Sequence, residues 1–333
     1  MTTTIKANGI GDVLAAIPAM AGYTPVESLV VLPMQGTRSC GLFRFDLPAF
    51  EKAGQDTETV AMSALGFLAR LDGVDGALFV VYSNNLHEVY ASLADTLGHC
   101  AALTGFDSRA AFVCADGWGE FGDVPNAPHT LPTLDMPEAL AAFRSQSEVE
   151  ETPPLSRERI EAITAATPRY SVALSSTAVA VALEALEHDP ADMHASTLGA
   201  LGALIGMPMF RDVALSAWCH GAEVANETLA YQIAFNKGDE LTAPDTLFLM
   251  GEGERPNPKN LEHALTVVRY LSAEQPFHAA ALATAAWLCW ALGRTSQAVT
   301  YAERALKVEE IGLAQIVHHM SMNSMLPAWA FTK

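Results

Sequence analysis

Three short, mostly apolar runs that include Val lie in the first third of the chain, at residues 28–34, 77–82 and 109–114. Runs of this length and composition are typical of buried strands. From residue 156 onward the apolar residues recur at intervals of three and four, which indicates helices. The sequence therefore predicts a sheet near the N-terminus and helices after it.

A further strand is predicted over residues 40–47. A Gly-containing loop of suitable length joins it to the strand at 28–34, which favours an antiparallel hairpin. The period of two places Phe43 and Phe45 on one face and Arg44 and Asp46 on the other. We expect the phenylalanine face to be buried.

Helices are predicted between these strands, at residues 57–71 and 85–103, and a short helix precedes them at residues 12–21. The order after that first helix is β-β-α-β-α-β. It predicts an α/β domain in which helices pack on a mixed sheet.

Glycine and proline become frequent after residue 116, which is typical of loops, although one helix is predicted at residues 136–146. We therefore expect an α/β domain at residues 1–133, a Pro/Gly-rich connecting region at 134–155 and an all-helical domain at 156–333. The helical domain is expected to end in a tetratricopeptide-like helix pair.

That final pair carries small residues at Ala286, Gly293, Ala298 and Ala305. Small side chains at this spacing let two helices approach closely. Only one such unit is found, whereas a solenoid needs about three. The pattern therefore predicts a packed helical hairpin and not a peptide-binding superhelix.

The chain is acidic, with 38 Asp and Glu residues, 19 Lys and Arg residues and a formal net charge of -19. Binding to nucleic acid by neutralising phosphates needs a basic face, so we expect no nucleic-acid partner. The charge also disfavours an anionic membrane surface. The apolar runs at residues 198–210 and 279–293 are shorter than the ~20 residues of a membrane-spanning helix.

The five cysteines are widely spaced and form no CxxC pair, so neither a disulfide framework nor a zinc ribbon is expected. The N-terminus lacks the basic and apolar regions of a signal peptide. Together these features predict a soluble, cytoplasmic protein.

The segment at residues 12–32, DVLAAIPAMAGYTPVESLVVL, resembles the opening signature of the actinobacterial domain of unknown function (DUF) family 4192. Residues 44–48 resemble the strand that follows in that family, and residues 156–158 and 287–306 are similar to its later landmarks. The resemblance implies a fold but no catalytic residues, because the family has no established activity. In the family an aromatic, Cys-bearing segment often follows the fourth strand, whereas residues 116–122 contain no Cys.

The first candidate site follows from the topology. If the strands at 77–82 and 109–114 are parallel, their carboxyl ends lie at one edge of the sheet, which is the usual ligand position in an α/β fold. The residues expected to line a common crevice there are Ser83, Asn84, Asn85, Asp116, Gly117 and Trp118. The alternative is that Ser-Asn-Asn caps a helix and Asp-Gly forms a turn. No phosphate-binding glycine motif follows either strand.

Glu27, Arg44 and Asp46 form the second candidate site. A lone Arg inside a strand, with carboxylates nearby, is most often part of a structural ion pair, which is the favoured interpretation. The alternative is that Arg44 anchors an anionic ligand.

Metal binding and nucleophilic catalysis have little support. Glu184 and His188 share a helix face, as metal ligands can, but residues 188–192 resemble a polar turn between helices and no HExxH motif is present. No GxSxG or SxxK motif is present either. We therefore expect no metal and no cofactor, and the sequence favours a non-enzyme.

The chain closes with a concentration of aromatic and Met residues, types that are enriched in the cores of protein interfaces. We interpret the protein as a non-catalytic interaction or assembly protein that uses its helical half to bind a protein partner or a second copy of itself. The residues expected to contact the partner are Trp287, Trp290, Met320, Met322, Met325, Trp329 and Phe331. Folding of this segment onto its own domain is the alternative for these residues. The alternative function is an enzyme or ligand-binding protein with its site at the strand ends.

Overall fold

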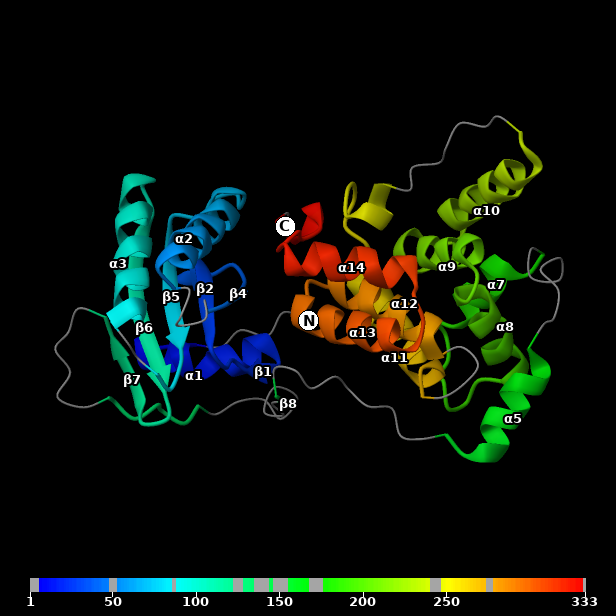
Figure 1. Cartoon of the computed structure of the whole chain (residues 1–333), viewed down its shortest axis with the longest axis horizontal. Helices are drawn as coiled ribbons and strands as arrows, with labels where there is room; N and C mark the ends of the chain where they lie inside the picture. The colour runs from blue at the N-terminus through cyan, green and yellow to red at the C-terminus, as the bar shows by residue number, and fades with distance from the viewer. Residues whose placement is uncertain are drawn as a thin grey trace. The chain divides into compact units, whose positions relative to one another are not determined.

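The computed structural model describes residues 6–47, 53–85, 88–121, 128–134, 144–145, 155–167, 176–239, 247–273 and 278–331. The chain divides into two compact units, Met1–Gln146 and Ser147–Lys333. The first unit is α/β and the second is helical, as the sequence predicts (Figure 1). The division falls inside the predicted connecting region.

The first unit is built on one mixed sheet with the order β3-β2-β5-β6-β7, in which β4 also pairs with β2. The strands β2 and β5 are antiparallel, β5 and β6 are parallel, and β6 and β7 are antiparallel. The strands are β2 (Ser28–Gln35), β3 (Arg38–Ser39), β4 (Phe43–Asp46), β5 (Gly76–Tyr82), β6 (Asp107–Cys114) and β7 (Gly117–Glu120). The helix α3 (Glu88–Leu103) lies between β5 and β6 in the chain, so the predicted parallel crossover is present.

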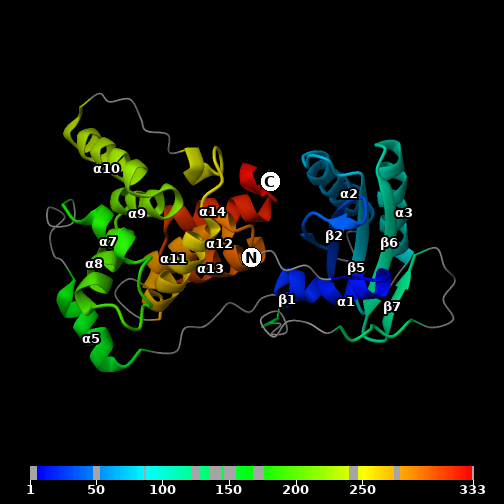
Figure 2. The ribbon, with the colours of Figure 1, turned by 180° about the vertical axis from the view of Figure 1, so that it is seen from behind.

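Helices cover the two faces of the sheet. On one face α1 (Ile10–Ala21) places Leu14 and Ile17 in a core with Val30 and Val80. On the other face Phe67 of α2 (Ala53–Ala69) lies 5.3 Å from Phe43, between ring centroids. Figures 1 and 2 show α2 and α3 beside each other on this side of the sheet.

The predicted alternation of β4 is confirmed. Phe45 is buried and packs against the ring of Phe67, as Phe43 does, so both phenylalanines face α2. Arg44 pairs in register with Val30, whose side chain belongs to the core under α1. Strand geometry therefore places Arg44 on the opposite face from the phenylalanines.

Two short strands lie where the sequence predicts loop or helix. Gly117–Glu120 forms β7, because its glycines allow close approach: a Cβ on Gly119 would lie 2.5 Å from the ring of Phe112. Arg144–Ser145 forms β8, which pairs in parallel with β1 (Tyr23–Thr24) and replaces this part of the predicted helix at 136–146. The rest of that predicted helix lies outside the described residues.

The second unit contains helices throughout its described ranges. They are α5 (Arg157–Ala166), α7 (Ala178–Glu184), α8 (Ala195–Ile205), α9 (Pro208–His220), α10 (Ala222–Lys237), α11 (Pro258–Leu271), α12 (His278–Ala291), α13 (Thr295–Val308) and α14 (Gly312–Met322), with short 3-10 helices η2 (Leu247–Met250) and η3 (Ala328–Ala330). The sequence predicts helices at residues 209–222 and 260–273 but none over residues 223–237, where α10 lies.

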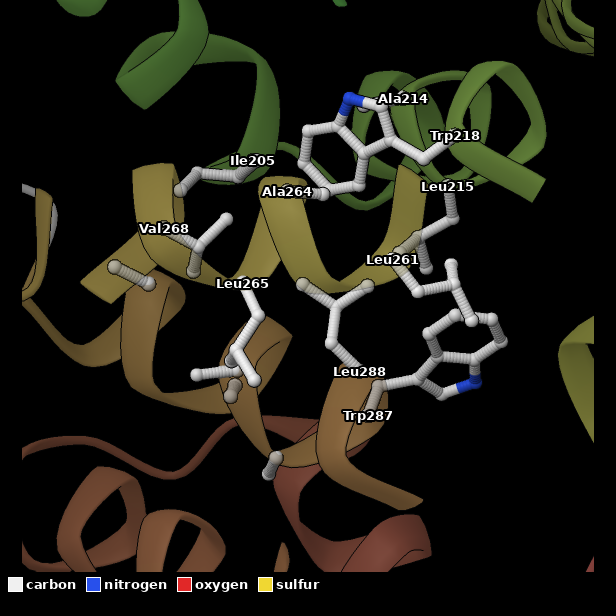
Figure 3. Close-up of a cluster of buried hydrophobic side chains, with 14 of the residues drawn as sticks. Ile205, Ala214, Leu215, Trp218, Leu261, Ala264, Leu265, Val268, Trp287 and Leu288 are labelled. Carbon is white, nitrogen blue, oxygen red and sulfur yellow. The ribbon is translucent and has the colours of Figure 1, made fainter. Parts of the chain in front are cut away.

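The helix α12 is the centre of this unit. Every residue from Ala281 to Ala291 is buried, because the helix is apolar on all sides and packs against α8, α11, α13 and α14. Figure 3 shows Trp287 and Leu288 of α12 beside Leu261 and Leu265 of α11. The predicted hairpin of α12 and α13 is therefore a packed part of the core, and it leaves no open face on α12.

None of the described helices is long and apolar enough to cross a membrane alone. The helices α8 and α9 pass the same test together, but the pair is bent by 113° and lines the core of the helical unit.

Candidate functional site

The two predicted sites lie at the same edge of the sheet. The parallel register places Tyr82 beside Val113, so β5 and β6 end together, and Ser83 donates its backbone N–H to the Val113 carbonyl at 3.1 Å. Because β2 is antiparallel to both β5 and β4, its first residue, Ser28, pairs with Tyr82 and with Asp46. The start of β2 and the end of β4 therefore join the carboxyl ends of β5 and β6.

A hydrogen-bond network connects Glu27 to the end of β5. The Ser83 hydroxyl lies 2.9 Å from both carboxylate oxygens of Glu27, and the backbone N–H of Asn84 lies 3.4 Å from one of them. The sequence analysis assigned Glu27 and Ser83 to different sites. The structure brings them together.

Glu27 has an unusual backbone conformation. Its φ of 43° lies in the left-handed region, which side chains other than Gly rarely adopt. Its carbonyl accepts a hydrogen bond from the backbone N–H of Leu47 at 3.1 Å, and its carboxylate is held by Ser83. One hydrogen bond to the backbone and one to the side chain therefore hold Glu27 in the left-handed conformation.

Tyr90, in the first turn of α3, completes the network. Its side chain is buried, and burial raises the pKa of its phenol. The nearby negative charge of Glu27 raises this pKa further, while a hydrogen bond with the Ser83 side chain lowers it. The sequence pattern does not single out Tyr90. Its position near the start of the helix that follows Ser83 is the one feature that could have indicated it.

The Ser83 hydroxyl has several partners. Since a carboxylate only accepts, Ser83 donates to Glu27, and its oxygen accepts the backbone N–H of Asn85 at 3.0 Å. Ser83 thus connects the carboxylate of Glu27 to the backbone that follows β5.

The asparagine and aspartate predicted for the crevice lie at this edge. The Asn84 side-chain oxygen accepts the backbone N–H of Ala115 at 2.9 Å, which ties the ends of β5 and β6 together. Asn85 and Asp116 are exposed at the same ends. These residues therefore lie together at the carboxyl ends of β5 and β6.

Gly117 and Trp118 do not extend from the edge as loop residues. Both belong to β7, and Trp118 exchanges backbone hydrogen bonds with His129 at 2.7–2.8 Å. The indole lies 3.0 Å from the position of a Cβ on Gly11, so it packs against the first turn of α1. The pairing of Trp118 with Val113 places it on the α1 face, whereas Ser83 faces the opposite way from its neighbour Tyr82.

Arg44 forms an ion pair with Asp46, and its Nε also donates to the Ser28 hydroxyl at 2.9 Å. The Arg44 side chain is only 11% exposed, whereas that of Asp46 is 79% exposed. A largely buried Arg that contacts a carboxylate and a hydroxyl fits the interpretation of Arg44 and Asp46 as a structural ion pair. At this edge the accessible charge of Asp46 is therefore negative.

The aromatic residues at the C-terminus are core residues, which corrects the expectation that they contact a partner. Trp287, Trp290, Met320, Trp329 and Phe331 are all buried. The three indole N–H groups donate to backbone carbonyls of the same unit, those of Leu249, Met325 and Ala291. The segment folds onto its own unit, and only Met322 and Met325 of the predicted set are exposed.

Of the two residues weighed as metal ligands, Glu184 has a side-chain partner, and His188 contacts His263 through its backbone carbonyl. Glu184 accepts the Thr197 hydroxyl at 3.1 Å, and the carbonyl of His188 lies 3.0 Å from Nε2 of His263. Within the described ranges, no three His, Cys, Asp or Glu side chains are grouped so as to hold a metal ion.

These observations define the first unit as an α/β domain with a polar cluster at the carboxyl ends of its parallel strands. Residues 11–123 match the family model described as "Domain of unknown function (DUF4192)", the family that the sequence resembles. The match includes Glu27, Ser83 and Tyr90. It does not extend to the predicted similarities at residues 156–158 and 287–306. Comparison with curated proteins and with solved structures gives no match.

Proposed function

We propose that the α/β unit binds a small polar ligand at the carboxyl ends of β5 and β6, with the Glu27 carboxylate as the main contact. The observation that supports this most strongly is the left-handed backbone of Glu27. Such a conformation costs of order 1–2 kcal/mol in a residue other than Gly, and strained residues cluster at ligand sites. The cost brings no evident benefit to packing, because Glu27 is exposed.

The chemistry of the edge indicates which ligands fit. A carboxylate accepts about four hydrogen bonds, and Ser83 and Asn84 fill only part of this capacity in Glu27. The exposed carboxylate can therefore accept from an ammonium, a guanidinium or a hydroxyl group. Asp116 is also exposed at this edge, and the charge of Asp46 is balanced by Arg44, so a cationic ligand is favoured over an anionic one.

Binding, rather than covalent catalysis, is the function that the network supports. Ser83 is the one hydroxyl that contacts Glu27 directly among the described hydrogen bonds, and its oxygen also accepts the backbone N–H of Asn85. Tyr90 is buried, and its raised pKa keeps the phenol protonated at neutral pH. Tyr90 therefore does not resemble an activated nucleophile.

The test is a thermal-shift measurement with a defined panel of spermidine, arginine, ribose and inorganic phosphate. A ligand of the native state raises the melting temperature. We expect at least one of the three donor-bearing compounds to stabilise the wild-type protein and phosphate to have no effect. The variant Glu27→Gln should lose this stabilisation, because a charged hydrogen bond contributes about 1.5–3 kcal/mol, equivalent to roughly 10- to 100-fold in Kd.

Glu58→Gln is the matched control, since it removes an exposed carboxylate from α2 of the same unit. It should respond to the panel as the wild type does. If no donor-bearing compound shifts the melting temperature, or if Glu27→Gln responds fully, the proposed binding site is wrong.

We also propose, as a second candidate, that the helical unit mediates self-association through a surface that shares only Met322 and Met325 with the predicted contact residues. Leu247, Met250, Met322 and Met325 are between 52% and 62% exposed, and we refer to them as the Met patch. Leu247 and Met250 share one face of η2, because side chains three apart eclipse in a 3-10 helix. Met residues are frequent at adaptable binding surfaces.

The residue that follows Met250 contacts the segment that follows Met325. The carbonyl of Gly251, directly after Met250, accepts the backbone N–H of Ala328, and a Cβ on Gly251 would lie 2.9 Å from Pro327. The carbonyl of Met325 accepts the indole N–H of Trp290 at 2.7 Å. The backbone segments that carry Met250 and Met325 are therefore neighbours in the helical unit.

The mass in solution tests this second candidate. If the Met patch joins two copies, light scattering should give twice the 35.5 kDa of one chain, and the double variant Met250→Gln/Met325→Gln should reduce it to one chain. Met62→Gln, which changes an exposed Met on α2, should leave the mass unchanged. A wild-type mass of one chain would exclude self-association.

A further inference from the structure

We draw no further inference here: the strongest candidate, the outer face of the C-terminal half of α10, where Tyr231 stacks on a largely exposed Phe235, carries nothing because the structure does not show what covers it.

Discussion

At the scale of single residues, Glu27 combines a strained backbone with an anchored side chain. Substitutions of Glu27 can separate the effect of the backbone conformation from that of the side chain. Gly adopts a positive φ without the Cβ penalty, whereas Ala removes the carboxylate but keeps that penalty. Glu27→Gly should therefore be more stable than Glu27→Ala by about 1 kcal/mol.

Urea unfolding of both variants measures this difference. Ser324, with a φ of 54°, is a second left-handed position and provides the control pair Ser324→Gly and Ser324→Ala. The two pairs should show similar gaps, because the penalty arises from the backbone alone. Equal stabilities for the two Glu27 variants would show that the left-handed conformation is absent in solution.

Arg269 is a buried cation in the last turn of α11, where the helix dipole favours positive charge. Its Nε donates to the Tyr301 hydroxyl at 2.9 Å. Tyr301→Phe keeps the ring and removes this acceptor, so it should lower the free energy of unfolding by about 1.5–3 kcal/mol. Tyr231→Phe, on the less buried α10, should change it little. Equal effects on denaturant unfolding would show that the Arg269 hydrogen bond contributes nothing.

At the scale of elements, the same Gly-to-Ala change should have opposite effects in two helices. In α3, a Cβ on Gly98 would meet nothing within 4 Å, so Gly98→Ala should stabilise by up to ~1 kcal/mol. In α8, a Cβ on Gly199 would lie 2.8 Å from the carbonyl oxygen of Ile163 in α5. Gly199→Ala must push the helices apart and should destabilise by about 1–3 kcal/mol. Thermal unfolding of both variants tests the close approach of α5 and α8, and a stabilising Gly199→Ala would contradict it.

The sequence predicts the central strands well because β2 and β5 are buried on both faces and appear as continuous apolar runs. Among the elements that the sequence did not predict, β7 and α10 differ in the reason. The glycines of β7 are typical of loops, and only the packing of Gly119 against Phe112 explains why a strand forms. In α10 few side chains are buried, Ala225 and Thr228 among them, so the apolar periodicity is weak.

At the scale of the whole molecule, the contacts that the sequence could not predict depend on the pairing register of strands far apart in the chain. The separation of Glu27 and Ser83 in the chain hides their contact, which depends on the antiparallel pairing of β2 with β5. The aromatic residues near the C-terminus illustrate a second limit. Composition alone does not distinguish an interface core from a protein core, since both are rich in aromatic residues and Met.

The buried C-terminal segment leads to a prediction about truncation. Deletion of residues 321–333 removes Trp329 and Phe331, which are buried, and the partner of the Trp290 indole. Loss of one buried Trp costs about 3–5 kcal/mol, so the truncated chain should have a clearly lower melting temperature. An unchanged melting temperature by calorimetry would show that this segment does not pack on the helical unit.

The most direct test of the central claim is hydrogen exchange of the full chain, measured by mass spectrometry with and without the stabilising compound from the panel. Binding at the edge should slow exchange in peptides that contain Glu27, Asn84 and Asp116, because a ligand suppresses local opening around its site. Peptides from the helical unit should be unaffected. Protection confined to the helical unit, or protection that persists unchanged in Glu27→Gln, would contradict the account.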